Sequence, residues 1–246
     1  MEHPGTAQML VPPAPWRFMP GTRALVQLLY RVRRLFGLHR YDEFILERIH
    51  GVPILVIPSV FNPKRLRTGA YFASLLEAGV IGCNAEVLDM GTGSGVCALF
   101  AARHARRVLA IDINAAAARC ARINTLLNHL EGRIEVRHGD LFEPAAGERF
   151  DLILFNPPFV IGEPRNDRDR AWRSTDVAQR FAQGLIRHLK PGGAALLLLS
   201  TYGDAAAFLR PLLDGGYHIC SVAQRGYLGE RLTLYRVTAG SAKEET

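Results

Sequence analysis

The sequence has few cysteines, and they are not arranged to bind a metal or to form a disulfide framework. The four cysteines include no Cys-x-x-Cys pair and have no nearby histidine partner. Structural zinc sites and disulfide-rich domains both need closely spaced cysteines. We therefore expect no metal and four buried free thiols, at Cys83, Cys97, Cys120 and Cys220.

Long apolar runs and a secretory leader are also missing. A membrane-spanning helix needs roughly 20 apolar residues, and the longest apolar stretches here are much shorter: "VPILVIPSV" and "GGAALLLLS". The first residues show no basic start followed by an apolar run, since they read "MEHPGTAQMLVPPAPW". The sequence therefore predicts a soluble, cytoplasmic protein without a membrane partner.

Negative charge is in the minority. The 246 residues include 30 Lys or Arg and 23 Asp or Glu, which gives a formal net charge of +7. A basic balance is compatible with a nucleic-acid partner. Because nearly all of the positive charge is arginine, whose use can follow a coding bias, the charge alone selects no partner. The length and the 48% apolar content favour one sizeable core with a small appendage.

The first 65 residues differ in pattern from the rest. Apolar residues recur at helical spacing over 24–36 with arginines between them, which predicts an amphipathic helix with a basic outer face. A short segment at 41–48 leads into "VPILVIPSVFNP" (52–63), whose β-branched residues are interrupted by prolines, which favours an edge hairpin or an extended arm. We therefore expect a helical and extended arm at 1–65, a main domain at 66–239 and a disordered tail at 240–246.

The main domain alternates strand, glycine turn and helix. This alternation predicts an α/β fold: a doubly wound, mostly parallel, Rossmann-like sheet of seven strands with helices on both faces. The predicted strands cover 86–90, 107–113, 133–140, 150–155, 194–200, 217–224 and 231–237. The predicted helices cover 96–105, 114–129 and 177–190, the last being stopped by "PGG".

The glycine turn after the first of these strands is the expected ligand site, because doubly wound sheets bind ligands beyond the carboxyl ends of their strands. The turn reads "DMGTGSG" and contains Gly91, Gly93 and Gly95. These glycines allow a tight turn that presents backbone amides at a helix N-terminus. A dinucleotide-binding turn would have a glycine at position 96, where this chain has Val96, so the pattern disfavours a nicotinamide cofactor.

Acidic residues follow the first three strands of the main domain. Asp89 can neutralise the cationic amino-acid end of a ligand, and Asp112 can accept both hydroxyls of a ribose. Asp140 can accept from an adenine amino group while Leu141 packs on the ring. Each acid alone could be a cap or a turn former. Their occurrence in order favours S-adenosylmethionine, which has no pyrophosphate for the acids to repel.

The chain resembles the class I S-adenosylmethionine-dependent methyltransferases in four stretches that occur in order: "VLDMGTGSGVCALFAA", "AIDIN", "GDLF" and "FNPPF". The resemblance covers about 60–237, and the layout after the last motif is most similar to the HemK-type protein-glutamine N5-methyltransferases. It implies a methyltransferase with S-adenosylmethionine as cofactor. The cofactor-binding residues that it implies are Thr68, Asp89, Gly91, Thr92, Gly93, Gly95, Asp112, Ile113, Asp140, Leu141 and Asn156.

The same resemblance assigns the catalytic role to "NPPF", which is Asn156, Pro157, Pro158 and Phe159. It implies that the side-chain oxygen of Asn156 and the carbonyl of Pro157 accept the two hydrogens of a planar NH2 group. The nitrogen lone pair then faces the methyl sulfonium, without a metal or a general base. The prolines keep the carbonyl aimed, and Phe159 stacks on the substrate. The alternative is a rigid turn after a strand.

The methyl acceptor is less specified than the cofactor. The overall layout favours a glutamine side-chain amide of a protein of the release-factor type. The alternative is an exocyclic base amine, guanine N2 or adenine N6, in RNA or DNA. The basic charge and Phe159, which replaces the tyrosine of the HemK pattern, support it. Arg67 also departs from that pattern, because it stands where an acidic residue is usual, but this departure is assigned to neither acceptor. A third reading is a binding module that keeps the fold without the chemistry.

The loop 162–176 is expected to form the rim of the substrate pocket. Its arginines and Trp172 could clamp or stack on an RNA, whereas the interleaved Asp167 and Asp169 could instead pair with them. The oligomeric state stays open.

Overall fold

The computed structural model of the chain describes residues 43–65, 67–158, 160–163, 173–227 and 229–240. The helix predicted at 24–36, Phe159 and most of the loop 162–176 lie outside the described residues, and their predictions stay untested.

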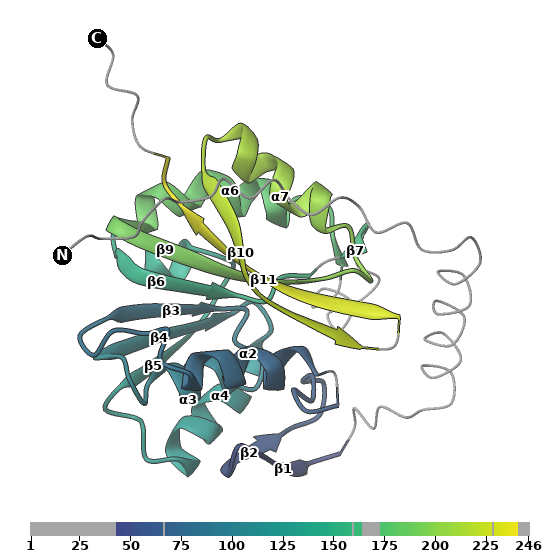
Figure 1. The fold of residues 1–246 in the computed structure, drawn as a ribbon. Helices are drawn as coiled ribbons and strands as arrows, with labels where there is room; N and C mark the ends of the chain where they lie inside the picture. Colours follow the sequence, from purple (N-terminus) through teal and green to yellow (C-terminus); the bar gives the residue numbers. More distant parts are fainter. Residues whose placement is uncertain (1–42, 66, 159, 164–172, 228, 241–246) are drawn as a thin grey trace, which may run out of the picture.

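A seven-stranded sheet forms the centre of the molecule, with the strand order β10-β11-β9-β6-β3-β4-β5. The strands from β9 to β5 are parallel to their neighbours, and β11 is antiparallel to both β9 and β10. The predicted mostly parallel, doubly wound sheet is therefore confirmed (Figure 1). The strands are β3 (Glu86–Met90), β4 (Arg107–Asp112), β5 (Ile134–His138), β6 (Phe150–Phe155), β9 (Leu189–Ser200), β10 (His218–Tyr227) and β11 (Glu230–Thr238).

Helices cover both faces of the sheet (Figure 1). One face packs against α2 (Thr68–Glu77), α3 (Val96–Ala101) and α4 (Ala115–Leu127). The other packs against α6 (Val177–His188) and α7 (Ala205–Asp214), with a 3-10 turn, η1 (Glu143–Ala145), between β5 and β6. Successive residues of a strand point to opposite faces of the sheet and pack in different cores. Val87 lies in one core and Leu88 in the other, and both are fully buried. Burial on both faces explains the nearly continuous apolar runs of these strands.

An N-terminal hairpin joins the first of these cores, as the prediction of an edge hairpin anticipated. It consists of β1 (Ile45–Ile49) and β2 (Val52–Val56), paired antiparallel. Asn124 of α4 fastens it: its Oδ1 accepts from the Leu55 N–H at 2.7 Å, and its Nδ2 donates to the Leu55 carbonyl at 2.7 Å. A side-chain amide thus satisfies a strand edge as another strand would. The boundary predicted at residue 65 stays a prediction.

The region 177–200 differs from the prediction. The helix ends at His188, and β9 begins at Leu189 instead of after "PGG". Leu189 pairs with Phe150, and the register then shifts so that Leu152 pairs with Ala194. The glycines and the proline therefore interrupt the ladder as a bulge within the strand, because the buried Leu189 already belongs to the sheet.

Other elements were not predicted from the sequence. Helix α7 contains Pro211, which obscured its pattern. Helix α2 was also missed, as were two short parallel strands, β7 (Val160–Ile161) and β8 (Arg173–Ser174). The prediction of buried thiols is wrong for Cys83 and Cys220, which are exposed because they lie on a loop and on an edge strand. None of the described helices is long and apolar enough to cross a membrane.

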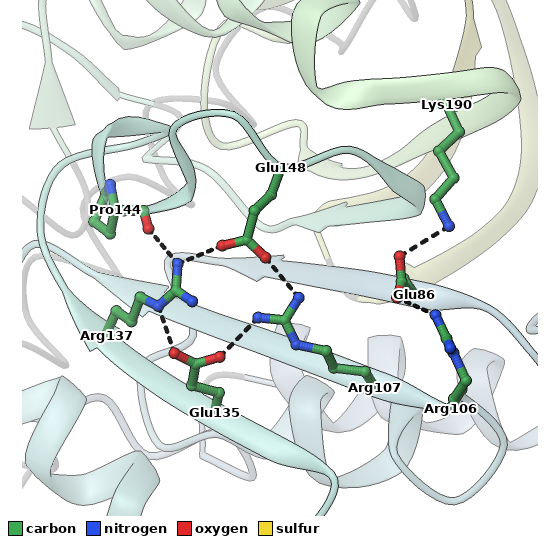
Figure 2. Close-up of polar contacts among 8 residues, drawn as sticks. All are labelled: Glu86, Arg106, Arg107, Glu135, Arg137, Pro144, Glu148 and Lys190. Atoms are coloured by element: carbon green, nitrogen blue, oxygen red, sulfur yellow. Dashed lines mark hydrogen bonds and ion pairs between the residues drawn. The ribbon is translucent and has the colours of Figure 1, made fainter.

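Charged side chains tie the amino ends of the strands together (Figure 2). Arg107 donates to Glu135 at 2.7 Å and to Glu148 at 2.5 Å, and Arg137 donates to the same two carboxylates. Lys190 contacts Glu86 at 2.9 Å in a neighbouring group. This network joins β4, β5 and the segment before β6, and it leaves the carboxyl edge of the sheet free for a site.

Replacing Glu148 by glutamine should lower the free energy of unfolding by about 1 kcal/mol near neutral pH, because a neutral amide cannot form ion pairs with Arg107 and Arg137. Burial alone would raise the pKa of Glu148, but hydrogen bonds from Arg107 and Arg137 bring it below the ordinary 4.5. A lowered carboxylate pKa contributes stability that is lost as the pH falls through that pKa. Denaturant unfolding should therefore show the two proteins converging in acid, and an equal difference at all pH values would contradict this.

Candidate functional site

The glycine turn lies between β3 and α3. Gly91, Gly93 and Gly95 have φ angles of 65°, 58° and 83°, in the left-handed region. A Cβ atom at Gly95 would also lie 3.2 Å from the Cα of Ala121 in α4. Any other residue there would combine backbone strain with a collision against a helix. The turn can therefore press against α4 only because this position is glycine.

A cavity of about 380 Å³ opens beside this turn, at the carboxyl edge of the sheet. Its lining combines residues from the ends of β3, β4, β5 and β6 with the start of α2. Gly95 does not line it, and Phe159 lies outside the described residues. The predicted site residues that the cavity brings together are Thr68, Asp89, Gly91, Thr92, Gly93, Asp112, Ile113, Asp140, Leu141, Asn156, Pro157 and Pro158.

Asp89 is buried at the floor of the turn, where its carboxylate organises the backbone. Its Oδ2 accepts from the Thr92 hydroxyl at 2.6 Å and from the Ala98 N–H at 2.9 Å. Burial raises the pKa of Asp89 to about 7, although both hydrogen bonds act to lower it. A carboxyl group poised in this way would ionise fully beside a bound cation.

Asp112 ends β4 and accepts a backbone hydrogen bond on each oxygen. Its Oδ2 accepts from the Gly93 N–H and its Oδ1 from the Asn114 N–H, both at 2.8 Å. Burial raises the pKa of Asp112, and the two amides oppose that rise. A carboxylate has about four acceptor positions, so each oxygen can still accept one hydroxyl hydrogen from a ligand in the cavity.

Asp140 has a partner that the sequence analysis missed. Arg180 of α6 donates to its Oδ2 at 2.6 Å and lies 3.6 Å from Asp176. The pair connects the end of β5 to α6, and both Asp140 and Arg180 line the cavity. The neighbouring Leu141 has a φ of 46°, an uncommon conformation for a leucine, and it lines the cavity.

Asn156, directly after β6, holds an unused acceptor at the cavity. Its Nδ2 donates to the Thr68 hydroxyl at 3.3 Å. Its Oδ1 is buried and has no hydrogen-bond partner within the part of the chain that the structure describes. A buried polar atom without a partner costs about 1–3 kcal/mol, and such atoms in native proteins are few. The arrangement therefore provides an acceptor that a ligand N–H can satisfy.

Asn124 is a second residue that the sequence analysis missed. Besides fastening the hairpin, its Nδ2 donates to the Ser94 carbonyl of the glycine turn at 2.8 Å. It is fully buried and supports the turn from behind. Neither Asn124 nor Arg180 belongs to a motif, so only a three-dimensional structure could reveal them. Among the described residues, no group of three or more His, Cys, Asp or Glu could hold a metal ion.

The profile of one family, described as "Methyltransferase small domain", matches residues 51–224. That range contains the hairpin strand β2, the glycine turn and Asn156.

Two curated relatives and one solved structure illustrate the similarity. The ribosomal RNA small subunit methyltransferase C of Alcanivorax borkumensis is 37% identical over 142 residues, covering 57% of this chain and 40% of that protein. The release factor glutamine methyltransferase of Koribacter versatilis is 35% identical over 191 residues, covering 64% of this chain and 66% of that protein. The structure of a T. thermophilus 16S rRNA methyltransferase in complex with AdoMet and guanosine has a TM-score of 0.58 and 24% identity. The match covers 78% of this chain and 49% of that protein. The chain thus spans about half the length of the curated relatives it matches, and its predicted fold class is confirmed.

The raised pKa of Asp89 can be tested without a ligand, through the pH dependence of the protein's stability. The folded protein holds the Asp89 proton up to about pH 7, whereas an unfolded aspartate releases it near 3.8. Stability should therefore fall as the pH rises between these values. Asp89→Asn removes this titration and keeps an oxygen that can accept from Thr92. Between about pH 4 and 7 the unfolding temperature of the wild type should fall relative to the variant, and parallel curves over that range would contradict the assignment.

Proposed function

Because the chain belongs to the methyltransferase small domain family, we propose that it transfers the methyl group of S-adenosylmethionine to a planar primary nitrogen. The buried, unpartnered Oδ1 of Asn156 is the single observation that carries this proposal. An NH2 group is the natural ligand for such an acceptor, because it can donate to Asn156 and keep a second hydrogen for a neighbouring carbonyl.

The cavity residues fit the cofactor that the sequence predicts. Asp112 retains acceptor capacity on both oxygens for two ribose hydroxyls, while its backbone contacts keep it in place. Asp140 can accept from an adenine amino group while Arg180 holds its other side. Asp89 has a pKa near neutrality, so it would become charged close to a cationic end of the cofactor. When bound, S-adenosylmethionine supplies an electrophilic methyl group on a positively charged sulfur.

Asn156 and Pro157 would orient the acceptor. The Asn156 oxygen and the Pro157 carbonyl each accept one hydrogen of the NH2 group, which directs the nitrogen lone pair toward the methyl group. A nitrogen held in this way by Asn156 and Pro157 would form its bond to the methyl carbon as the carbon–sulfur bond breaks, and the cofactor would leave as a neutral thioether. The product nitrogen then releases a proton to water. Pro157 and Pro158 have no N–H that would compete for the acceptor oxygens.

We propose an exocyclic base amine of RNA as the acceptor. The rRNA methyltransferase of A. borkumensis resembles this chain at 37% identity, and the formal charge of +7 is compatible with a polyanionic substrate. A protein glutamine, the acceptor of HemK-type enzymes, is the second candidate. Its support is the release factor glutamine methyltransferase, of which the alignment covers 66%. Both acceptors present the same planar NH2 group to Asn156.

Labelled S-adenosylmethionine and a cell extract divided into untreated, RNase-treated and protease-treated portions test the activity and the acceptor together. We expect label that is lost with RNase. Asn156→Ala should lower kcat by about 100-fold, the usual effect of removing one oriented polar contact. Its affinity for S-adenosylmethionine, measured by calorimetry, should change little. Label lost only with protease would select the glutamine acceptor, and no transfer to any portion would overturn the proposed activity.

Thr68 is predicted to keep the Asn156 amide in its productive orientation, because its hydroxyl accepts from Nδ2 and leaves Oδ1 for the substrate. Thr68→Val has the same shape without the hydroxyl, so the amide can turn over and kcat should fall about tenfold, a difference of about 1.4 kcal/mol. Thr68→Ser keeps the hydroxyl and should restore most of the rate.

The pair of Thr68 variants also separates two roles of this residue. If Thr68 acts mainly on the cofactor, as the family resemblance implies, Thr68→Val should weaken S-adenosylmethionine binding and leave the rate at saturation close to that of the wild type. Equal rates in Thr68→Val and Thr68→Ser at saturation would contradict the orienting role.

A further inference from the structure

Two exposed arginines gather around one tyrosine beside the cavity. The Arg67 guanidinium carbon lies 4.9 Å from the centre of the Tyr227 ring, and that of Arg225 lies 5.5 Å from the same centre. Arg225 also lies 5.6 Å from the centre of the Tyr71 ring of α2. Arg67 directly precedes α2, while Arg225 and Tyr227 belong to the end of β10. We call Arg67 and Arg225 the arginine pair.

The arginine pair has no ion-pair partner among the described residues, unlike the other cations of this region. Lys64 lies 3.1 Å from Glu47, and Arg180 lies 2.6 Å from Asp140. Burial raises the pKa of Glu230, and Ser200 and Arg67 oppose that rise. Its carboxylate accepts from the Ser200 hydroxyl at 2.6 Å and makes no ion pair with Arg67. The pair therefore concentrates positive charge without a matching carboxylate.

This arrangement is unfavourable in the absence of an anion. Two like charges around one ring repel each other, and the attraction of each guanidinium group to the ring is weak at an exposed site. Contact with the ring orders a guanidinium group while its N–H donors stay available for two-pronged contacts with phosphate oxygens. An anion with several oxygens would satisfy both arginines at once.

The position of the pair relates that anion to the reaction site. Arg67 is bonded to Thr68, which lines the cavity and accepts from Asn156. Arg67 has a φ of 66°, a left-handed conformation that is unfavourable for an arginine. Figure 1 shows the β10–β11 hairpin extending past the neighbouring strands toward this side of the molecule. An anion on the pair would therefore lie at the mouth of the cavity, next to a substrate held by Asn156.

We propose that the arginine pair binds the phosphodiester backbone of a nucleic-acid substrate, beside the nucleotide whose base enters the cavity. This inference rests on the proposed function for the identity of the cavity, and it deepens that proposal by assigning the residues that hold the polymer. Phosphate contacts position a substrate without reading its sequence. The pair should accordingly contribute affinity and register for RNA, while the choice of base belongs to the cavity.

Binding of a labelled single-stranded RNA oligonucleotide of mixed sequence, followed by fluorescence anisotropy between about 50 and 200 mM salt, tests the pair. The double variant Arg67→Gln, Arg225→Gln should bind about tenfold more weakly at low salt and lose about 1.4 from the slope of log affinity against log salt, about 0.7 for each phosphate contact. Arg225→Lys keeps the charge and should keep most of the slope.

The matched control is Arg236→Gln. Arg236 is an exposed arginine of the same hairpin, paired with Cys220 at the end away from Tyr227. Its removal should change the slope little. Equal losses in the Arg225→Gln and Arg236→Gln single variants would overturn the proposal, since any surface charge would then suffice. Wild-type binding by the double variant would overturn it as well. Unchanged unfolding temperatures exclude loss of folding as the cause.

Failure of this inference and failure of the proposed function have different signatures. Asn156→Ala removes no phosphate contact, so it should keep the wild-type salt slope for the oligonucleotide while it loses methyl transfer. If the wild type transfers no methyl group but the arginine pair still controls RNA binding, the activity fails and the binding surface stands. If the wild type methylates a glutamine peptide and the double variant binds RNA normally, the surface fails and the methyltransferase stands.

Discussion

The carboxyl edge of the sheet depends on how Asp112 divides its two carboxylate oxygens between two backbone amides. One amide belongs to Gly93 in the turn after β3, and the other to Asn114 at the start of α4. A side chain at the end of β4 thereby fixes the loop of the neighbouring strand and the helix that follows its own strand. The Thr92 N–H adds a bond to the Ile111 carbonyl at 3.0 Å. The positions of the cavity residues therefore follow from the parallel register of β3 and β4.

The turn is also held from the side away from the cavity. Asn124 joins the Leu55 backbone of the hairpin to the Ser94 carbonyl. Because Asn124 is fully buried, these contacts do not compete with water and keep their full directional value. The hairpin is consequently part of the scaffold of the site, even though it contributes no side chain to the cavity lining.

The sequence predicted the features that local chemistry determines. The bounds of β3 and β6 agree with the prediction. Each is a short apolar run bounded by charged or turn residues, a pattern typical of a buried strand. The cavity residues in motifs were predicted because the ends of parallel strands meet at one edge. Helix α7 and the start of β9 were not predicted. Both contain proline or glycine, which locally indicate a break, and the tertiary packing accommodates these residues within the element. The partnership of Arg180 with Asp140 joins residues far apart in the chain, and no local pattern encodes it.

The charged network and the cavity occupy opposite ends of the same strands. Glu86 and Met90 lie at the two ends of β3, four residues apart, which corresponds to about 13 Å in a strand. Effects of substitutions at such distances usually add without coupling. Changes at the amino edge that raise thermal stability can therefore be combined with changes at the carboxyl edge that alter substrate preference. The sheet thus makes the stability and the specificity of this protein separately adjustable, for selection and for engineering alike.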